Sequence, residues 1–176
     1  YHSQRQIKRF TMRKVITLIF AASAIALCGC ASLRMTPEEK AEIEAKVQEN
    51  LDNRSFVIEV DQMNPLRGGT RHVTNYSLQV DGDRLVSALP YFGQAWNLPY
   101  GGGKGMNFES TIRDYIETIP KADRREITIT TNNGEDTFVF VLDVFTNGKA
   151  SIGVRSRNRE PIEYQGMMRT TPQSEK

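Results

Sequence analysis

The stretch "TNNGEDTFVFVLDVFTNGKASIGV", residues 131–154, decides the fold class of this chain. At its centre, residues 138–145 form an apolar run rich in Val and Phe, two residue types that favour β-strands. An Asn-Gly pair lies on each side of this run, and Asn-Gly between apolar segments is a strong signal for a β-hairpin. Because apolar residues occupy both odd and even positions, we predict a central strand that is covered on both faces, with an N-terminal helix as one cover.

Short strands and turns of the same kind are repeated on either side of this stretch. Alternating apolar residues and turn signals predict strands at residues 56–60, 76–80, 85–89, 127–131, 138–145, 151–156 and 162–168. Residues 112–119 fit either a helical stripe or a strand, and their β-branched residues in an all-β context favour a strand. The sequence thus predicts a mainly β fold with about eight strands, an antiparallel meander that forms a barrel or half-barrel.

A helix is predicted before the first strand, at residues 37–50. Thr36 supplies an N-cap, Pro37 occupies the first helical position, and two acidic residues follow in the first turn. Apolar residues are sparse along this segment, so most of the helix is expected to face solvent. We assign residues 37–168 to a single β-rich domain that includes this helix, and residues 169–176 to a disordered tail.

The N-terminal region has the pattern of a secretory signal. Residues 15–27 carry no charge, follow Arg13 and Lys14, and lead into small residues. A membrane-spanning helix needs about 20 apolar residues, so this run is too short to be one. Met12 opens a typical signal sequence, whereas the residues before it are basic and polar without a structural pattern. We therefore predict a leader and lipoprotein signal peptide at residues 1–29.

The two cysteines of the chain, Cys28 and Cys30, lie at the end of this signal. The sequence Leu27-Cys28-Gly29-Cys30 resembles a bacterial lipobox, in which the last Cys receives the lipid. The resemblance implies that the chain is cleaved after Gly29 and that Cys30 carries a lipid with acyl chains such as palmitate. The lipid would anchor the protein to the membrane, with residues 30–36 as a tether. Two alternatives remain: an ordinary signal peptide with incidental cysteines, or a C-x-C metal pair, which would need further Cys or His ligands.

The charge of the chain changes sign when the predicted leader is removed. The whole sequence carries 23 Lys and Arg against 21 Asp and Glu, and five of the basic residues lie in the leader. The remaining chain is mildly acidic, so its charge argues against a nucleic-acid partner. Its length suffices for one domain with a sizeable core, without disulfide crosslinks.

The most unusual segment is "YFGQAWNLPYGGGKGMNFES", residues 91–110, which holds the only Trp. Such a long loop in a compact domain is usually functional or disordered. Its aromatic residues either close one end of the barrel or line the mouth of a cavity for an apolar or sugar-like ligand. The glycine-rich part is not a phosphate-binding loop, because no Ser or Thr follows its Gly-Lys pair. The candidate ligand-binding residues are Tyr91, Trp96, Tyr100 and Lys104.

Basic side chains are also found in two other places. The loop at residues 63–72 holds Arg67, Arg71 and His72 around a Gly-Gly pair, and is interpreted as a solvated hairpin tip or an anion site. Residues 155–159 carry Arg at alternate positions, which would place the three arginines on one solvated strand face if the strand extends that far. Neither G-x-S-x-G nor H-E-x-x-H occurs, so the sequence predicts no catalytic residue, metal site or cofactor, and does not indicate an enzyme.

Three segments carry a resemblance to a known family: "NYSLQVDGDRLVSALPYFGQAW", "LPYGGGKGMNF" and "DTFVFVLDVFTNGKASIGVRSRNREPIEYQG". They resemble the domain-of-unknown-function family four-two-five-one, envelope lipoproteins of Bacteroides-type bacteria. The resemblance covers residues 56–166 and implies a secreted, lipid-anchored, largely β domain with a strand at residues 112–119. It implies no established activity and no catalytic or binding residues.

The residues after Cys30 bear on which side of the outer membrane the protein faces. Surface-exported lipoproteins of such bacteria tend to resemble one another in having acidic residues directly after the lipidated Cys, but here the first acidic residue is Glu38. We therefore expect an outer-membrane lipoprotein that faces the periplasm and is anchored by its lipid. The leading hypothesis is a non-enzymatic protein that binds a small apolar or amphipathic ligand through residues 91–108. The alternatives are an assembly accessory that docks another envelope protein by a sheet edge or the acidic helix, and a hydrolase with an unrecognised site.

Overall fold

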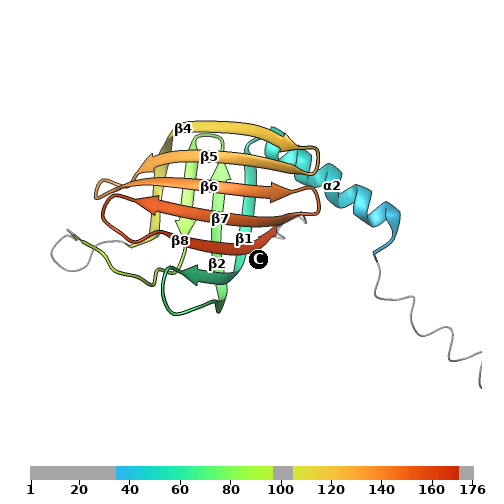
Figure 1. Cartoon of the computed structure of the whole chain (residues 1–176). Helices are drawn as coiled ribbons and strands as arrows, with labels where there is room; N and C mark the ends of the chain where they lie inside the picture. Colours follow the sequence, from blue (N-terminus) through green and yellow to red (C-terminus); the bar gives the residue numbers. More distant parts are fainter. Residues whose placement is uncertain (1–34, 97–104, 171–176) are drawn as a thin grey trace, which may run out of the picture. The chain divides into compact units, whose positions relative to one another are not determined.

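The computed structural model describes residues 35–96 and 105–170 of the chain (Figure 1). Within these ranges the chain forms one helix followed by eight strands, and the strands account for most of the described residues. The elements are α2 (Pro37–Asp52), β1 (Ser55–Pro65), β2 (Arg71–Asp81), β3 (Arg84–Ala88), β4 (Asn107–Lys121), β5 (Arg124–Asn132), β6 (Thr137–Phe145), β7 (Lys149–Ser156) and β8 (Ile162–Met168).

The eight strands form a closed antiparallel barrel in sequence order. Each strand pairs with the next one along the chain, and β1 pairs with β8 to close the sheet. This confirms the predicted mainly β meander of eight strands with an N-terminal helix. The alternation of inward apolar and outward polar residues fixes the register, since a shift by one residue would turn every inward side chain to solvent.

The ambiguous segment at residues 112–119 is a strand, as its β-branched content predicted. It lies within β4, where a bulge between Ile112 and Asp114 shifts the pairing with β5 by one residue. Before the bulge Phe108 and Ile112 face the core, and after it Ile116 and Ile119 face solvent with 59% and 66% of their surface exposed. The apolar residues that suggested a helical stripe therefore do not share one face.

Several predicted boundaries were too short because polar residues continue the strands. The expected loop at residues 63–72 is reduced to a tip at residues 66–70, since Met63 packs in the core and pairs with Arg71 of β2. The long loop after β3 ends at residue 106 rather than 110, because β4 begins at Asn107. Helix α2 continues two residues beyond the predicted end.

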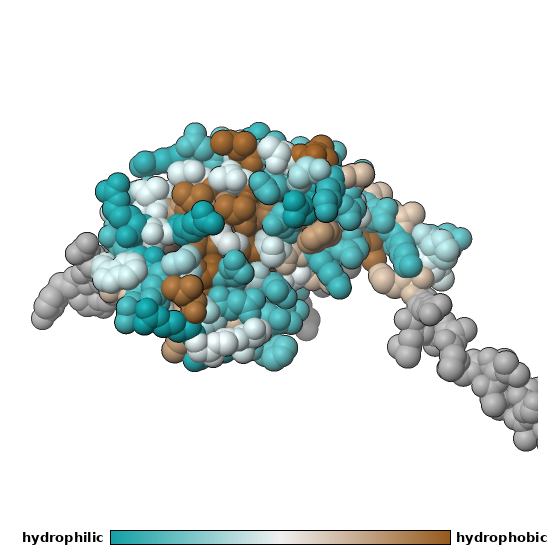
Figure 2. Space-filling view, in the orientation of Figure 1, coloured by the Kyte–Doolittle hydropathy of each residue, from teal (hydrophilic) through white to brown (hydrophobic). Residues whose placement is uncertain are grey.

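The prediction that β6 is covered on both faces is wrong. Phe138, Phe140 and Leu142 are buried in the barrel, whereas Val139 and Val141 point outward and are partly exposed. A barrel strand has only one face in the core, so outward apolar residues need no cover. Figure 2 shows apolar residues over the middle of this outer wall, among polar neighbours.

The interior of the barrel is a continuous apolar core. Eight strands enclose a space that side chains can just fill, and inward-facing residues from every strand contribute to one buried cluster. The rings of Phe108, Phe138 and Phe140 pack with centroid distances between 4.8 and 6.4 Å. Helix α2 adds Val47 and Leu51, and Val47 lies beside Gly148 in the β6–β7 turn.

The end of the domain differs slightly from the predicted tail. Arg169, the first residue of that tail, donates its backbone N–H to Val57 O at 2.8 Å and its Nε to Glu59 Oε1 at 2.9 Å. It therefore continues the pairing of β8 with β1 and is part of the folded domain. Residues 171–176, together with the predicted signal peptide, Cys30 and most of the tether, lie outside the described residues.

The described part of the chain contains no helix that is both long enough and apolar enough to cross a membrane.

Candidate functional site

The two ends of the barrel are built differently. Tight turns join the strands at one end, which we call the helix end because the buried residues of α2 pack there. These turns are residues 82–83, 122–123 and 146–148. Longer connections meet at the opposite end, the loop end, and they are residues 66–70, 89–106, 133–136 and 157–161. Figure 1 shows helix α2 and the β7–β8 connection at opposite ends of the strands.

A short segment at the loop end, residues 91–96, lies beside the β7–β8 connection, and we call it the strap. The backbone N–H of Trp96 donates to Asn158 O at 2.7 Å, and that of Glu160 donates to Gln94 O at 3.0 Å. Between these two hydrogen bonds, Ala95 forms an isolated β-bridge. The strap is thus held in place like a short strand, although it connects β3 to β4.

Both ends of the long connection are fixed to the barrel by side chains that donate hydrogen bonds. The hydroxyl of Tyr164, which is fully buried, donates to Pro90 O at 2.6 Å just before the strap. The buried hydroxyl of Ser87 donates to Met106 O, also at 2.6 Å. Burial raises the pKa of Tyr164 well above its usual range, so this hydroxyl stays protonated and keeps its donor role.

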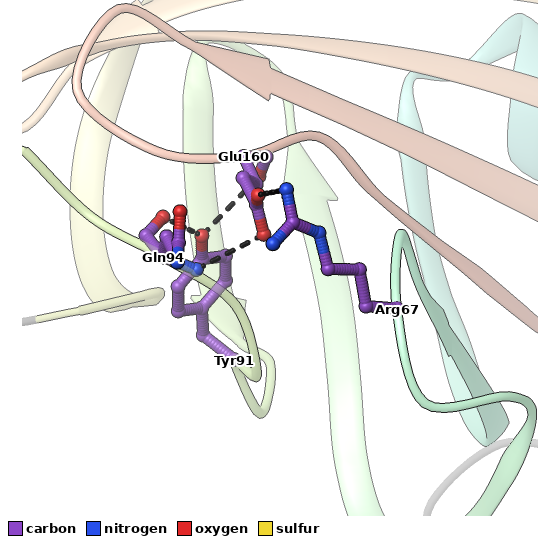
Figure 3. A network of polar contacts seen from close by, with 4 residues as sticks. All are labelled: Arg67, Tyr91, Gln94 and Glu160. Atoms are coloured by element: carbon purple, nitrogen blue, oxygen red, sulfur yellow. Dashed lines mark hydrogen bonds and ion pairs between the residues drawn. The ribbon is translucent and has the colours of Figure 1, made fainter.

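A polar network joins the strap to the β1–β2 tip through Glu160 (Figure 3). The hydroxyl of Tyr91 donates to Gln94 O at 2.6 Å and lies 3.3 Å from Glu160 O. The buried carboxylate of Glu160 accepts from the Gln94 backbone N–H at 3.1 Å and forms an ion pair with Arg67 at 3.5 Å. Partial burial raises the pKa of Tyr91, so its hydroxyl is a donor at neutral pH. The Tyr91 hydroxyl therefore stabilises the backbone of the strap at Gln94.

Gly93 allows the strap to fold this tightly. A Cβ at this position would lie 2.7 Å from the Tyr91 hydroxyl oxygen and 3.4 Å from Glu160 Oε2. Any side chain here would push on the polar network. The close approach of the Tyr91 side chain, and not an unusual backbone angle, therefore favours glycine here.

Apolar and cationic side chains lie together on the outside of the loop end. Phe92 and Trp96 keep 45% and 50% of their surface exposed, although both belong to the pinned strap. Leu66 at the β1–β2 tip is also exposed. The guanidinium carbon of Arg71 lies 3.7 Å from the centroid of the Phe92 ring, a cation–π contact. This surface offers flat apolar faces next to positive charge.

Arg159 departs from the predicted row of solvated arginines. Arg155 and Arg157 are partly or fully exposed as expected, but Arg159 is only 7% exposed. The reason is that β7 ends at Ser156, after which the chain turns and runs beside the strap. The guanidinium carbon of Arg159 lies 5.3 Å from the centroid of the Tyr91 ring.

The structure describes two of the four predicted ligand-binding residues. Tyr91 and Trp96 lie together in the strap, the first facing the polar network and the second exposed. Tyr100 and Lys104, like the lipidation candidate Cys30, lie outside the described residues. His72 is exposed on β2, and within the described ranges no three His, Cys, Asp or Glu side chains are grouped as metal ligands.

Sequence reasoning missed the partners of the strap. Gln94, Glu160 and Arg159 were not candidates, because no motif marks them and the strap is separated from the β7–β8 connection by more than sixty residues. The alternating arginines at residues 155–159 were the available signal, and they were interpreted as a solvated face. Only the end of β7 at Ser156 shows that the pattern stops there.

Comparison with known proteins identifies relatives of the whole domain. A search of curated proteins gives no match. Among solved structures, a DUF4251 family protein from Bacteroides eggerthii is similar, with a TM-score of 0.56 and 18% sequence identity over 73% of this chain and 87% of that chain. At this identity the likeness concerns the fold. Residues 38–168 match the family described as "Domain of unknown function (DUF4251)". The chain therefore belongs to the DUF4251 family.

Proposed function

We propose that this protein is a non-enzymatic, lipid-anchored protein of the outer membrane that faces the periplasm and binds a small amphipathic ligand at the loop end. One observation carries the proposal: two aromatic side chains, Phe92 and Trp96, are exposed on a segment whose backbone is pinned. Arg71 lies against one of them and adds a positive charge.

Exposed aromatic residues on a fixed segment are suited to binding. Aromatic side chains bury a large area when a ligand covers them. Binding costs less when the groups that make contact are already ordered, since less conformational freedom is lost. The hydrogen bonds at Gln94 and Trp96 supply that order, so the two rings are presented without a prior folding step.

The strap and the buried residues of α2 lie at opposite ends of the barrel. The predicted lipidation site, Cys30, precedes helix α2, and the buried residues of α2 pack at the helix end. The loop end lies at the other end of the strands.

The closed sheet weakens the alternative that the protein docks another envelope protein by a sheet edge. An assembly accessory that docks by a sheet edge needs an unpaired strand, but β1 pairs with β8 and the sheet has no terminal strand. Among the described strands, β2 and β4 have unpaired stretches where they extend beyond the short strand β3. The loop end is the broader candidate surface.

Native mass spectrometry of the protein purified from its own envelope tests the proposal. We expect a small bound molecule on the wild-type protein and its loss when Phe92 and Trp96 are both replaced by Ser. The matched control replaces Ile116 and Ile119 by Ser, because these apolar side chains are even more exposed but lie on β4. Equal binding by both variants, or no bound molecule on the wild type, would contradict the proposal.

A further inference from the structure

We infer that Arg159 binds the oxyanion head group of the ligand, a carboxylate or a phosphate. This inference rests on the proposed function of the loop end and adds the charge and the position of one ligand group. It starts from a buried positive charge that the described part of the chain leaves without a counterion.

The burial of Arg159 is the first step. Only 7% of its surface is exposed, and none of the described residues accepts a hydrogen bond from its buried Nε. A guanidinium stays charged at all physiological pH values. Buried charges in proteins are normally paired and hydrogen-bonded, because removing them from water is costly. A buried guanidinium without such a pair is therefore expected to bind a further partner that carries a negative charge.

The neighbouring carboxylates do not supply that partner. Glu160 is engaged by Arg67 and by the backbone N–H of Gln94. Asp136 accepts from the backbone N–H groups of Thr137 at 2.8 Å and Asn158 at 3.2 Å. Among the described residues, no ion pair includes Arg159.

The one aromatic contact of Arg159 does not replace an anion. The Tyr91 ring lies 5.3 Å from its guanidinium carbon, near the limit at which a cation–π contact is felt. A ring face also satisfies none of the five N–H donors of a guanidinium. The contact therefore leaves the N–H donors of Arg159 available.

The charge and shape of the site favour an oxyanion. The planar fork of a guanidinium matches two oxygens of a carboxylate or phosphate. Arg71 adds a second positive charge on the same end of the barrel, above Phe92. A ligand with its head group at Arg159 and an apolar part against Phe92 and Trp96 would use both features of the loop end.

The test follows the Nε–H signals of arginine by ¹⁵N NMR on the full chain. The protein is titrated with sodium phosphate and, separately, with sodium acetate, at ionic strength held constant with sodium chloride. We expect the Arg159 Nε–H signal to shift and saturate in at least one titration. The anion that saturates at the lower concentration identifies the head group as phosphate or carboxylate.

Two conservative variants give the control. Arg159→Lys should abolish the saturable response, whereas Arg155→Lys, an exposed arginine four residues away, should keep it. Should Arg159→Lys fail to fold, the wild-type titrations still decide. The absence of saturation in both titrations, or an unchanged response in folded Arg159→Lys, would overturn the inference.

The titration of Arg159 and the test of the proposed function can give different results. A small molecule bound at Phe92 and Trp96 without any saturation at Arg159 would reject the oxyanion site alone. Saturation at Arg159 without a molecule bound by the purified protein would reject the proposed function and retain the anion site.

Discussion

Among the described glycines, the closest backbone approach lies at Gly166, where the barrel closes. Gly166 of β8 faces Glu59 and Val60 of β1, next to the bulge between Val60 and Gln62. A Cβ on Gly166 would overlap the Glu59 carbonyl oxygen and lie 3.0 Å from Val60 Cα. Gly153 of β7 faces outward, and a Cβ there would meet only Val141 O, at 3.8 Å.

We predict that Gly166→Ala is strongly destabilising. Because the contact is with backbone, β1 and β8 must move apart, and overpacking of this kind costs about 3 kcal/mol. Gly153→Ala is the matched control and should change the free energy of unfolding by less than about 0.5 kcal/mol. Urea denaturation of both variants measures the difference, and similar midpoints would show that the closure tolerates a methyl group.

Tyr115 makes stability depend on pH at the alkaline end. Burial, with a smaller contribution from Glu117, raises the pKa of Tyr115 to about 12, and its buried hydroxyl has no hydrogen-bond partner in the part of the chain that the structure describes. In the unfolded chain the pKa is about 10. Since the folded pKa is the higher one, the contribution of Tyr115 is complete below about pH 10 and is lost as the pH rises toward 12.

Tyr115→Phe should therefore flatten the alkaline limb of the stability curve. At neutral pH the variant should be close to wild type, because the lost hydroxyl has no partner. The measurement is the free energy of unfolding at about pH 8 and about pH 11 for both proteins. A parallel decrease in the two proteins would mean that Tyr115 ionises as readily in the folded state.

Among the elements, the strands were largely predictable, and so were both ends of β8, whereas several other strand ends were not. Alternation and the Asn-Gly turns identified the cores of β6, β7 and β8, because both signals are local. The ends of β1 and β2 were missed since their polar residues pair only with each other and with β8. The bulge in β4 has no local signal, so the outward direction of Ile116 could not be predicted.

Helix α2 was predicted correctly as a helix, and its thin apolar stripe explains why few of its residues are buried. Only Val47 and Leu51 are buried, at the C-terminal half, where Asp52 also forms an ion pair with Arg125 at 2.6 Å. The helix is thus held by a small contact at the helix end of the barrel.

Leu51→Ala should show how much that contact contributes. We predict a loss of about 2–5 kcal/mol, the usual cost of truncating a buried leucine. Glu44→Ala, on the exposed side of the same helix, should change stability by less than about 0.5 kcal/mol. Equal thermal midpoints for the two variants would indicate that the helix does not contribute to the stability of the barrel.

At the scale of the whole molecule, the fold class and the aromatic strap were predictable, and the assembled loop end was not. Residues 91–96 were noticed because they hold the only Trp in an unusually long loop. Their partners, Arg159 and Glu160, come from a distant connection that only the closed barrel brings alongside. Long-range pairing of this kind leaves no pattern in either segment.

The proposed anchor has a direct test in cells. Cys30→Ser should abolish labelling with palmitate and release the protein from the membrane fraction, because the thiol that carries the lipid is gone. The folded domain should remain intact, since residue 30 precedes its first element. Continued labelling and membrane retention of the variant would contradict lipidation at this site.

The most direct test of the central claim is photocrosslinking in the native envelope. A photoreactive amino acid is placed at position 92, on the strap, or at position 116, on β4, and the protein is purified and its mass measured. The account predicts a small-molecule adduct at position 92 and none at position 116. An adduct of protein size at position 92, or equal labelling at the two positions, would contradict a small-ligand site at the loop end.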